Sequence, residues 1–256
     1  VCRHQDRPKF DDIVSKIFDK SEYLSGDRLF ADDSSLKGCL AKIGNKKFLV
    51  IGNDKGKDID SRVKNNFGMA KPEGYRKAQR LFNIASKFNL PIVTFIDTPG
   101  AYPGIDAESR GQSEAIATNL LEMSDLKVPI LSYVIGEGGS GGALAIGVCD
   151  NLSMLEYSIY SVISPEGCAS ILYKNAEFAS NAAEAMKITA NDLRKLNLID
   201  EIISEPLGGA HRNIKPVAKN ITNSIVENLK YLTTLEVDSL LKKRKEKIMS
   251  MGIYSE

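Results

Sequence analysis

The sequence has 256 residues, enough for one large domain or two small ones, and its 43% apolar and 26% charged residues are those of an ordinary globular protein. The net charge of +1 gives no overall field that would favour nucleic acid or an anionic membrane, and no apolar run approaches the roughly 20 residues of a membrane-spanning helix. Four cysteines without a C-x-x-C pair argue against a zinc knuckle or a disulfide scaffold and favour a reducing compartment.

The chain begins with a polar segment and then alternates between strands and helices. Because it opens at Val1 without an initiator Met, we expect that an N-terminal segment was removed or left out. Residues 47–52 form an apolar run that predicts a buried strand, and residues 72–88 predict a helix, since Pro72 suits a first helical turn and apolar residues recur at helical spacing. Further strands are predicted at 92–97, 129–135, 158–163 and 199–203, and further helices at 107–124, 143–148, 176–187 and 191–196.

The start of another helix is well marked at Ser164. Ser164 is a good N-cap, Pro165 suits the first helical position, and Glu166 lies near the positive helix end. We interpret Glu166 mainly as a stabiliser of this helix start, with a contact to substrate as the second interpretation.

Two helices are predicted at the C-terminal end, at about 215–250, after a loop over 205–213 that is rich in Gly and Pro. The second helix, at about 235–249, carries the run Lys242–Lys245, which we interpret as a solvated helix face. Alternating strands and helices predict an α/β fold with mostly parallel strands. Without a linker or a second composition block, residues 1–256 are predicted to form a single domain.

The first candidate loop is Asp97-Thr98-Pro99-Gly100-Ala101-Tyr102-Pro103-Gly104. It follows a strand at its carboxyl end, where α/β folds place their ligands. Two Pro-Gly pairs fix a tight path, and Tyr102 offers a flat face for a planar ligand. We therefore expect this loop, "loop 97–104" below, to shape the wall of a pocket.

The second candidate is the glycine segment, residues 135–143 (I-G-E-G-G-S-G-G-A), which we expect to be a turn between a buried strand and a helix. Glycine allows close approach of the backbone, and successive N–H groups at the start of a helix converge on a negative oxygen. Such donors can stabilise charge that develops in a reaction, and losing one costs about 100- to 1000-fold in a well-studied hydrolase. The segment therefore predicts chemistry carried by the backbone.

Three other interpretations use the same letters. Gly136-x-Gly138-x-x-Gly141 matches a dinucleotide fingerprint, but that fingerprint belongs to the first strand–helix unit and here it comes third. Gly138-x-Ser140-x-Gly142 matches a nucleophile elbow, whose histidine partner would have to be His4 or His211, both in polar loops. Loop 97–104 resembles a GTPase switch, but no G-x-x-x-x-G-K-[ST] motif accompanies it.

Together the motifs resemble one family, the alpha subunit of bacterial and plastid acetyl-CoA carboxylase carboxyltransferase. The resemblance spans nearly the whole chain, although members of the family usually carry a further N-terminal helical segment. Its motifs are N-F-G-M-A-K-P-E-G-Y-R-K-A (66–78), I-D-T-P-G-A-Y-P-G (96–104), R-G-Q-S-E-A-I-A (110–117), I-G-E-G-G-S-G-G-A-L-A-I-G (135–147), Y-S-V-I-S-P-E-G-C-A-S-I-L (160–172) and E-P-L-G-G-A-H-R-N (205–213).

The resemblance revises the expected fold and implies a reaction. It implies the crotonase fold, a spiral of ββα units with a helical C-terminal extension, in place of a plain parallel sheet. It also implies transfer of a carboxyl group from carboxybiotin to acetyl-CoA, giving malonyl-CoA for fatty-acid synthesis, with the biotin attached to a carrier protein. No metal is expected in this chain.

The resemblance also assigns roles to residues of both candidate segments. It places an oxyanion hole for the ureido oxygen of biotin at Gly141, Gly142 and Ala143, and we expect the N–H groups of Gly141 and Gly142 to be the donors. Carboxybiotin would be bound by Gly138, Gly139, Tyr102, Pro103 and Gly104. The roles of Glu137 and of His211 stay open between function and structure.

The implied partners are a zinc-containing beta subunit, a biotin carboxyl carrier protein and biotin carboxylase, in an assembly of two alpha and two beta chains. Both the bacterial cytoplasm and the plastid stroma fit. Two alternatives from other classes are a crotonase-like hydrolase or peptidase that uses Ser140, and a non-catalytic subunit that supports an active partner.

Overall fold

A computed structural model of the chain describes residues 1–252, which share one sheet of eight strands. In space the order is β1-β2-β3-β4-β5-β6-β8, and β7 pairs only with the end of β5. The pairs β1–β2 and β2–β3 are antiparallel, and all pairs from β3 onward are parallel. The strands are β1 (Lys20–Tyr23), β2 (Leu36–Ile43), β3 (Lys46–Asn53), β4 (Ile92–Thr98), β5 (Ile130–Gly139), β6 (Asn151–Leu155), β7 (Ile159–Ser161) and β8 (Glu201–Ile203).

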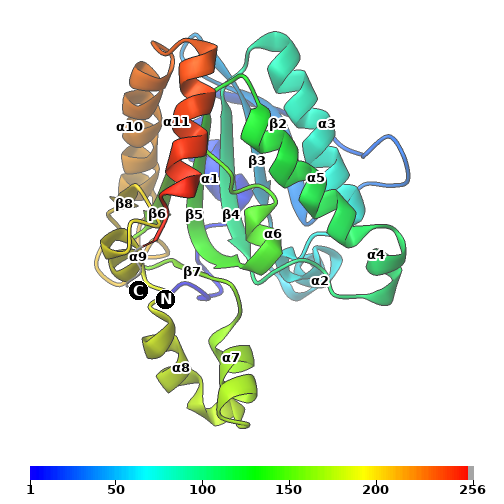
Figure 1. The fold of residues 1–256 in the computed structure, drawn as a ribbon, viewed down its shortest axis with the longest axis vertical. Coiled ribbons are helices and arrows are strands. Elements are labelled where there is room, and N and C mark those ends of the chain that lie inside the picture. Colours follow the sequence, from blue (N-terminus) through cyan, green and yellow to red (C-terminus); the bar gives the residue numbers. More distant parts are fainter. Residues whose placement is uncertain (253–256) are drawn as a thin grey trace.

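Helices cover both faces of this sheet, so that two apolar cores form, one on each side (Figure 1). One core contains α3 (Pro72–Phe88), α5 (Gln112–Asp125), the short α6 (Ser140–Leu144) and α9 (Ala190–Lys195). The other contains α1 (Phe10–Ile17), α10 (Ile214–Leu232) and the start of α11 (Val237–Met249). The shorter helices are α2 (Ile59–Lys64), η1 (Asn66–Gly68) and α4 (Ile105–Ser109).

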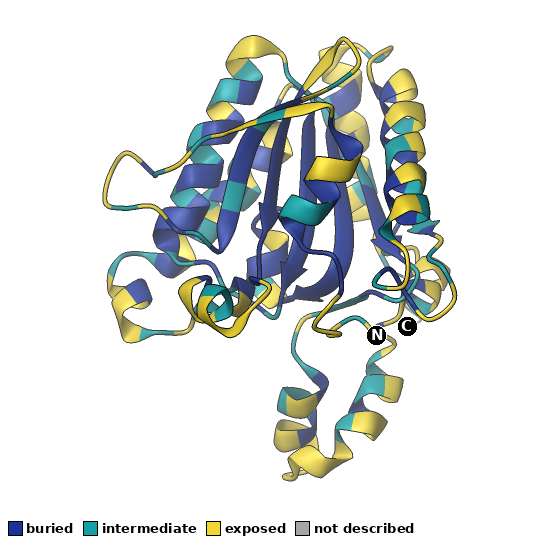
Figure 2. Ribbon diagram, turned by 180° about the vertical axis from the view of Figure 1, so that it is seen from behind, coloured by how far each residue is buried: buried dark blue, intermediate teal, exposed yellow. Residues whose placement is uncertain are grey.

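The central strands are buried on both sides, which explains their continuous apolar sequences (Figure 2). Every residue of β4 and of β5 is buried. Their carboxyl ends therefore form a rigid edge from which loop 97–104 and the glycine segment emerge. This edge is where an α/β sheet places its ligands.

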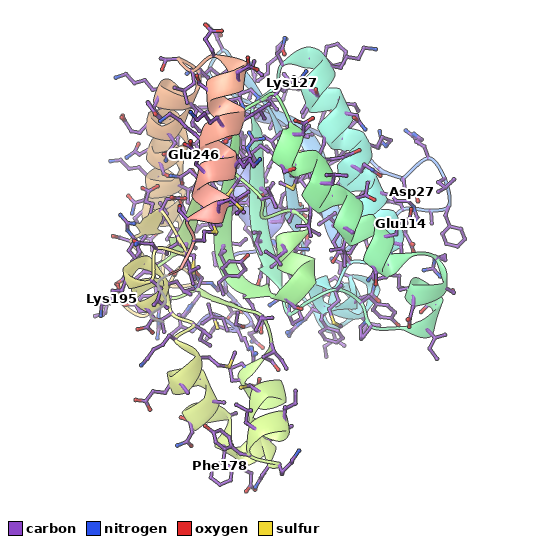
Figure 3. All side chains as sticks on the ribbon, viewed as in Figure 1. Asp27, Glu114, Lys127, Phe178, Lys195 and Glu246 are labelled. Atoms are coloured by element: carbon purple, nitrogen blue, oxygen red, sulfur yellow. The ribbon has the colours of Figure 1, made fainter. Side chains whose placement is uncertain are left out.

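A helical hairpin projects from the body below the sheet (Figure 1). It consists of α7 (Pro165–Leu172), η2 (Ala176–Phe178) and α8 (Ala179–Met186), and most of it is exposed (Figure 2). The side chain of Phe178 lies at its tip (Figure 3). The predicted helix start is confirmed, since the Ser164 hydroxyl accepts a hydrogen bond from the N–H of Gly167 at 3.1 Å.

Several elements differ from the sequence-based expectation. Helix α1 and strand β1 lie in the first 35 residues, which were interpreted as a polar segment, and the apolar residues of α1 are buried. The helix expected at 107–124 is divided in two, because Gly111 adopts a left-handed conformation with φ of +83° between α4 and α5. The glycine segment is a turn only in part, since β5 extends through Gly139 and α6 begins at once at Ser140.

The interpretation of Lys242–Lys245 as a solvated face is wrong for Arg244, which is only 1% exposed. Its guanidinium donates to both carboxylate oxygens of Asp150, each at 2.8 Å. It also donates to the carbonyls of Met123, Leu126 and Val128, where α5 ends. Arg244 thus neutralises the negative end of α5 and attaches α11 to the body.

We expect Arg244→Met to lower the free energy of unfolding by about 3–5 kcal/mol, because it leaves Asp150 buried without its partner. Urea unfolding measures the change. The control is Lys245→Met, which removes a neighbouring exposed charge and should change stability by less than about 0.5 kcal/mol. Equal midpoints for the two variants would contradict the assigned role of Arg244.

Candidate active site

The candidate site begins with a bulge at the carboxyl end of β5. Ile96 of β4 pairs with Val134, but Thr98 pairs with Gly138, so the three residues 135–137 lie opposite Asp97 alone. We call these three residues the β5 bulge. A bulge bends a strand and redirects the residues that follow it. Here it directs the chain from Gly138 onward toward β7 and into α6 (Figure 1).

The first turn of α6 provides backbone donors without acceptors. An α-helix offers no internal acceptor for its first N–H groups. Among residues 1–252, no loop or side-chain acceptor takes up the N–H of Gly141 or of Gly142. Gly141 is half-buried, Gly142 is buried, and the side chain of Ala143 packs into the core. The structure therefore brings the predicted donors together at the start of one short helix.

The glycine segment and loop 97–104 are in direct backbone contact. A Cβ added to Gly142 would lie 2.4 Å from the carbonyl carbon of Gly100, and one added to Gly139 would lie 2.2 Å from the carbonyl oxygen of Pro99. Distances this short exclude any side chain. Gly139 and Gly142 are therefore glycine because the two segments touch there.

Tyr102 lies further along loop 97–104 and is half-buried. Its N–H donates to the carbonyl of Ala70 at 3.0 Å, and the ammonium of Lys71 lies 4.7 Å from its ring centroid. A Cβ on Gly104 would come within 2.3 Å of the ring, so Gly104 lies directly against it, and Pro103 is exposed. The ring is thus held in a fixed place with part of its surface already covered.

Behind the bulge lies a buried group of charges, the Lys55 cluster, which consists of Lys55, Asp97 and Glu137. The Nζ of Lys55 lies 2.9 Å from Asp97 Oδ1 and 2.8 Å from Glu137 Oε2. The three side chains are 10%, 3% and 8% exposed. Burial alone would lower the pKa of Lys55, but attraction to Asp97 and Glu137 outweighs it and raises this pKa.

The N-terminal segment adds two arginines to this group. Arg3 donates to Glu137 Oε1 at 2.9 Å and to Glu166 in the first turn of α7 at 2.7 Å, and this hydrogen bond lowers the pKa of Glu166. Arg7 forms a fully buried bidentate pair with Glu205, at 2.9 and 2.6 Å. Glu137 and Glu205 are thus each already paired with an arginine.

Ser140 is exposed and has φ of +51°, a strained geometry that also occurs at nucleophile elbows. The two histidines stack on one another with ring centroids 3.9 Å apart, and His4 accepts the N–H of Asp6. Within the described residues, no hydrogen bond joins either ring to Ser140. The partner that a serine nucleophile needs is therefore not in place.

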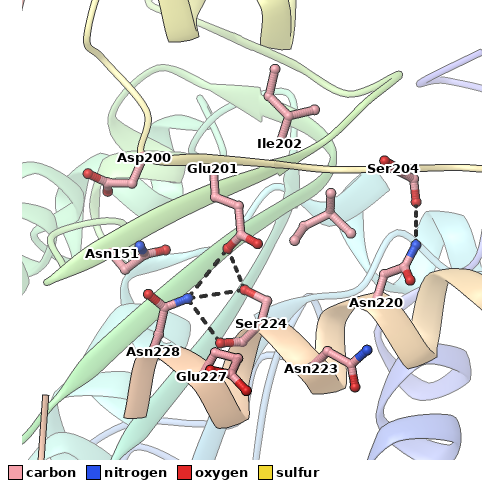
Figure 4. Close-up of a pocket in the computed structure, with 11 residues that line it drawn as sticks. Asn151, Asp200, Glu201, Ile202, Ser204, Asn220, Asn223, Ser224, Glu227 and Asn228 are labelled. Atoms are coloured by element: carbon pink, nitrogen blue, oxygen red, sulfur yellow. Dashed lines mark hydrogen bonds between the residues drawn. The ribbon is translucent and has the colours of Figure 1, made fainter. Parts of the chain in front are cut away.

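A separate groove of about 570 Å³ lies between β8 and α10 (Figure 4). None of its lining residues within 1–252 belongs to the glycine segment or to loop 97–104. Its central carboxylate, Glu201, already accepts hydrogen bonds from Ser224 at 2.5 Å and from Ser153 at 3.1 Å. We interpret this network as part of the packing of α10 on the sheet.

Sequence reasoning missed Lys55, Arg3 and Arg7. The one available signal was the position of Lys55 just after a buried strand, since parallel strands end at a common edge. Within residues 1–252, no three His, Cys, Asp or Glu side chains are grouped so that they could hold a metal ion. In the same range, every helix is too short or too polar to cross a bilayer.

A family profile and two curated relatives indicate the same family. A family profile described as "Acetyl co-enzyme A carboxylase carboxyltransferase-like" matches residues 1–252. The acetyl-coenzyme A carboxylase carboxyl transferase subunit alpha of Pasteurella multocida is 59% identical over 252 residues, which are 98% of this chain and 80% of the relative. That of Francisella tularensis subsp. novicida is 57% identical over 256 residues, 100% of this chain and 81% of the relative.

Solved structures share the fold at low sequence identity. Transcarboxylase 12S, solved with methylmalonyl-coenzyme A bound, superimposes with a TM-score of 0.71 at 20% identity, over 88% of this chain and 41% of that one. A Pseudomonas malonate decarboxylase hetero-tetramer in complex with coenzyme A gives 0.68 at 15% identity, over 83% and 85%. The predicted crotonase fold is thereby confirmed. The chain belongs to the family of acetyl-CoA carboxylase carboxyltransferase alpha subunits.

Proposed function

We propose that the chain transfers the carboxyl group of carboxybiotin to acetyl-CoA, giving malonyl-CoA for fatty-acid synthesis, as a single carboxyltransferase domain. The observation that carries this proposal is the pair of unpaired N–H groups at Gly141 and Gly142, placed at the ligand-binding edge of the sheet. Membership of the family supports the substrate assignment.

The arrangement fits a biotin ureido group. When carboxybiotin is bound, it supplies the carboxyl group and a ureido oxygen on which negative charge develops. Two converging N–H donors stabilise such a charge, and they do so without reorganisation because Gly142 is locked against Gly100. Gly138 and Gly139 bring the backbone to this position, while Tyr102, Pro103 and Gly104 line the neighbouring wall.

The proposed partners complete the site. The family name implies a beta subunit, and we propose that this zinc-containing subunit binds acetyl-CoA in a complex of two alpha and two beta chains. The biotin would arrive on a biotin carboxyl carrier protein after carboxylation by biotin carboxylase. A reducing compartment, either the bacterial cytoplasm or the plastid stroma, accommodates the four free cysteines.

The decisive experiment mixes the purified chain with its beta subunit and measures decarboxylation of malonyl-CoA in the presence of free biotin. We expect Gly142→Ala to lower kcat about 100- to 1000-fold, because its Cβ would displace Gly100 and with it the aligned donors. The control is Gly44→Ala in the turn between β2 and β3, where an added Cβ meets nothing within 4 Å; its φ of +56° makes this variant less stable, but kcat per folded molecule should stay at the wild-type value. Full activity of the Gly142 variant would sink the assignment.

Ser140→Ala separates transfer from hydrolysis. Serine and alanine are both small, and either one must adopt φ of +51° at position 140. Because the strain is similar, the backbone and its donors should stay in place, and we expect kcat to change by less than about threefold. A serine hydrolase would instead lose more than about a thousandfold. The same malonyl-CoA assay, together with an ester substrate, measures both activities, and a large loss would favour the hydrolase.

A further inference from the structure

The β5 bulge leaves backbone groups outside the ladder, and buried charged side chains take them up. The N–H of Glu137 donates to Asp97 Oδ1 at 3.0 Å, and the carbonyl of Ile135 accepts a hydrogen bond from Arg7 Nε at 2.7 Å. A bulge disrupts the hydrogen-bond ladder locally, so its conformation depends on side chains that replace the missing backbone partners. The path of β5 into α6 is therefore set by side chains that the mechanism itself does not use.

Asp97 is the common anchor of both walls of the site. Its carboxylate holds the N–H of Glu137 on β5, and its own backbone leads into loop 97–104, which touches Gly139 and Gly142. The fit is tight, because a Cβ on Gly136 would lie 2.4 Å from Asp97 Oδ1. A shift of this carboxylate would therefore move the donors and the opposing loop together.

Lys55 makes this arrangement possible. Asp97 and Glu137 are both buried and close to the same ammonium, so without it two carboxylates would repel each other across the bulge. The second oxygen of Glu137 is held by Arg3, which fixes the carboxylate from the other side. A buried ion pair contributes little net stability, because the attraction between its charges is offset by the cost of removing them from water. A role in positioning the backbone would explain why this protein keeps these charges.

We propose that Lys55 and Glu137 are positioning residues that, through Asp97, hold the β5 bulge so that Gly141 and Gly142 present their N–H groups to the developing charge. This inference rests on the proposed function, since it assigns the cluster to the same site. The two residues fix the backbone conformation of the site, and they affect the reaction only through that conformation.

The test uses the complex with the beta subunit and the biotin-dependent decarboxylation of malonyl-CoA. Lys55→Met should lower kcat about 100-fold, as a misplacement of about 1 Å does, while KM for malonyl-CoA stays within about twofold. The isosteric Glu137→Gln keeps the backbone N–H and the Lys55–Asp97 pair, so it should fold normally and lower kcat about tenfold. Hydrogen exchange of the peptide that covers residues 130–144 should become faster in both variants.

Arg244→Met is the matched control, because it also breaks a buried ion pair but lies at the other end of β5, where Asp150 accepts the N–H of Ile130. Per folded molecule, its kcat should equal that of the wild type, and its lower stability should speed exchange across the whole sheet rather than at residues 135–144 in particular. If Lys55→Met does not fold, Glu137→Gln decides alone. Wild-type kcat and exchange in Glu137→Gln would overturn the positioning role.

The two proposals fail in different ways. If the wild-type complex shows no biotin-dependent decarboxylation, the proposed function fails, whereas the exchange measurements still report on the bulge. If Gly142→Ala is inactive but Lys55→Met and Glu137→Gln match the Arg244→Met control, the function stands and the positioning role is wrong.

Discussion

The rest of the site depends on one irregularity in the sheet, the three residues of β5 that lie opposite Asp97. Without the bulge, β5 would continue as a regular strand beside β4, and its glycines would lie within that strand. The bulge bends β5 instead, so that the strand leads directly into α6 and the first N–H groups of that helix reach the edge of the sheet. Because a bulge cannot satisfy its own backbone groups, the molecule commits the carboxylate of Asp97 and the guanidinium of Arg7 to them.

Long segments with a clear period were predictable from the sequence. The helix at 72–88 was predicted with both ends, from Pro72 in its first turn and from Pro91 beyond its last residue. In the structure it ends at Asn89, which has a left-handed conformation with φ of +52°. Helix α1 was missed because it is only eight residues long and lies in a largely charged segment, although its buried residues Phe10, Ile13, Val14 and Ile17 recur at helical spacing. The division at Gly111 was missed because a single glycine within a helical pattern does not reveal its backbone angle.

The geometry of the candidate site was predictable in part, because the proposed donors lie close together in the sequence and the residues that support them do not. Six consecutive positions, 138–143, include four glycines, which marked the segment as a candidate site without deciding its ligand, and the structure places these positions at the sheet edge. Lys55, by contrast, lies 82 positions from Glu137 along the chain, and Arg7 lies 198 positions from Glu205. Their pairing follows from the order of strands and the fold of the N-terminal segment, which no local pattern encodes.

The contact of Gly142 with Gly100 means that the glycine segment and loop 97–104 fix each other's conformation. Each one occupies the space that a side chain on the other would need, and Gly139 repeats this relation with Pro99. Grafting the glycine segment alone into another α/β scaffold would therefore transfer its sequence without loop 97–104, the surface that determines its conformation. The unit that could be moved between proteins, or altered by design, is the pair of strand ends together with the lysine that joins them.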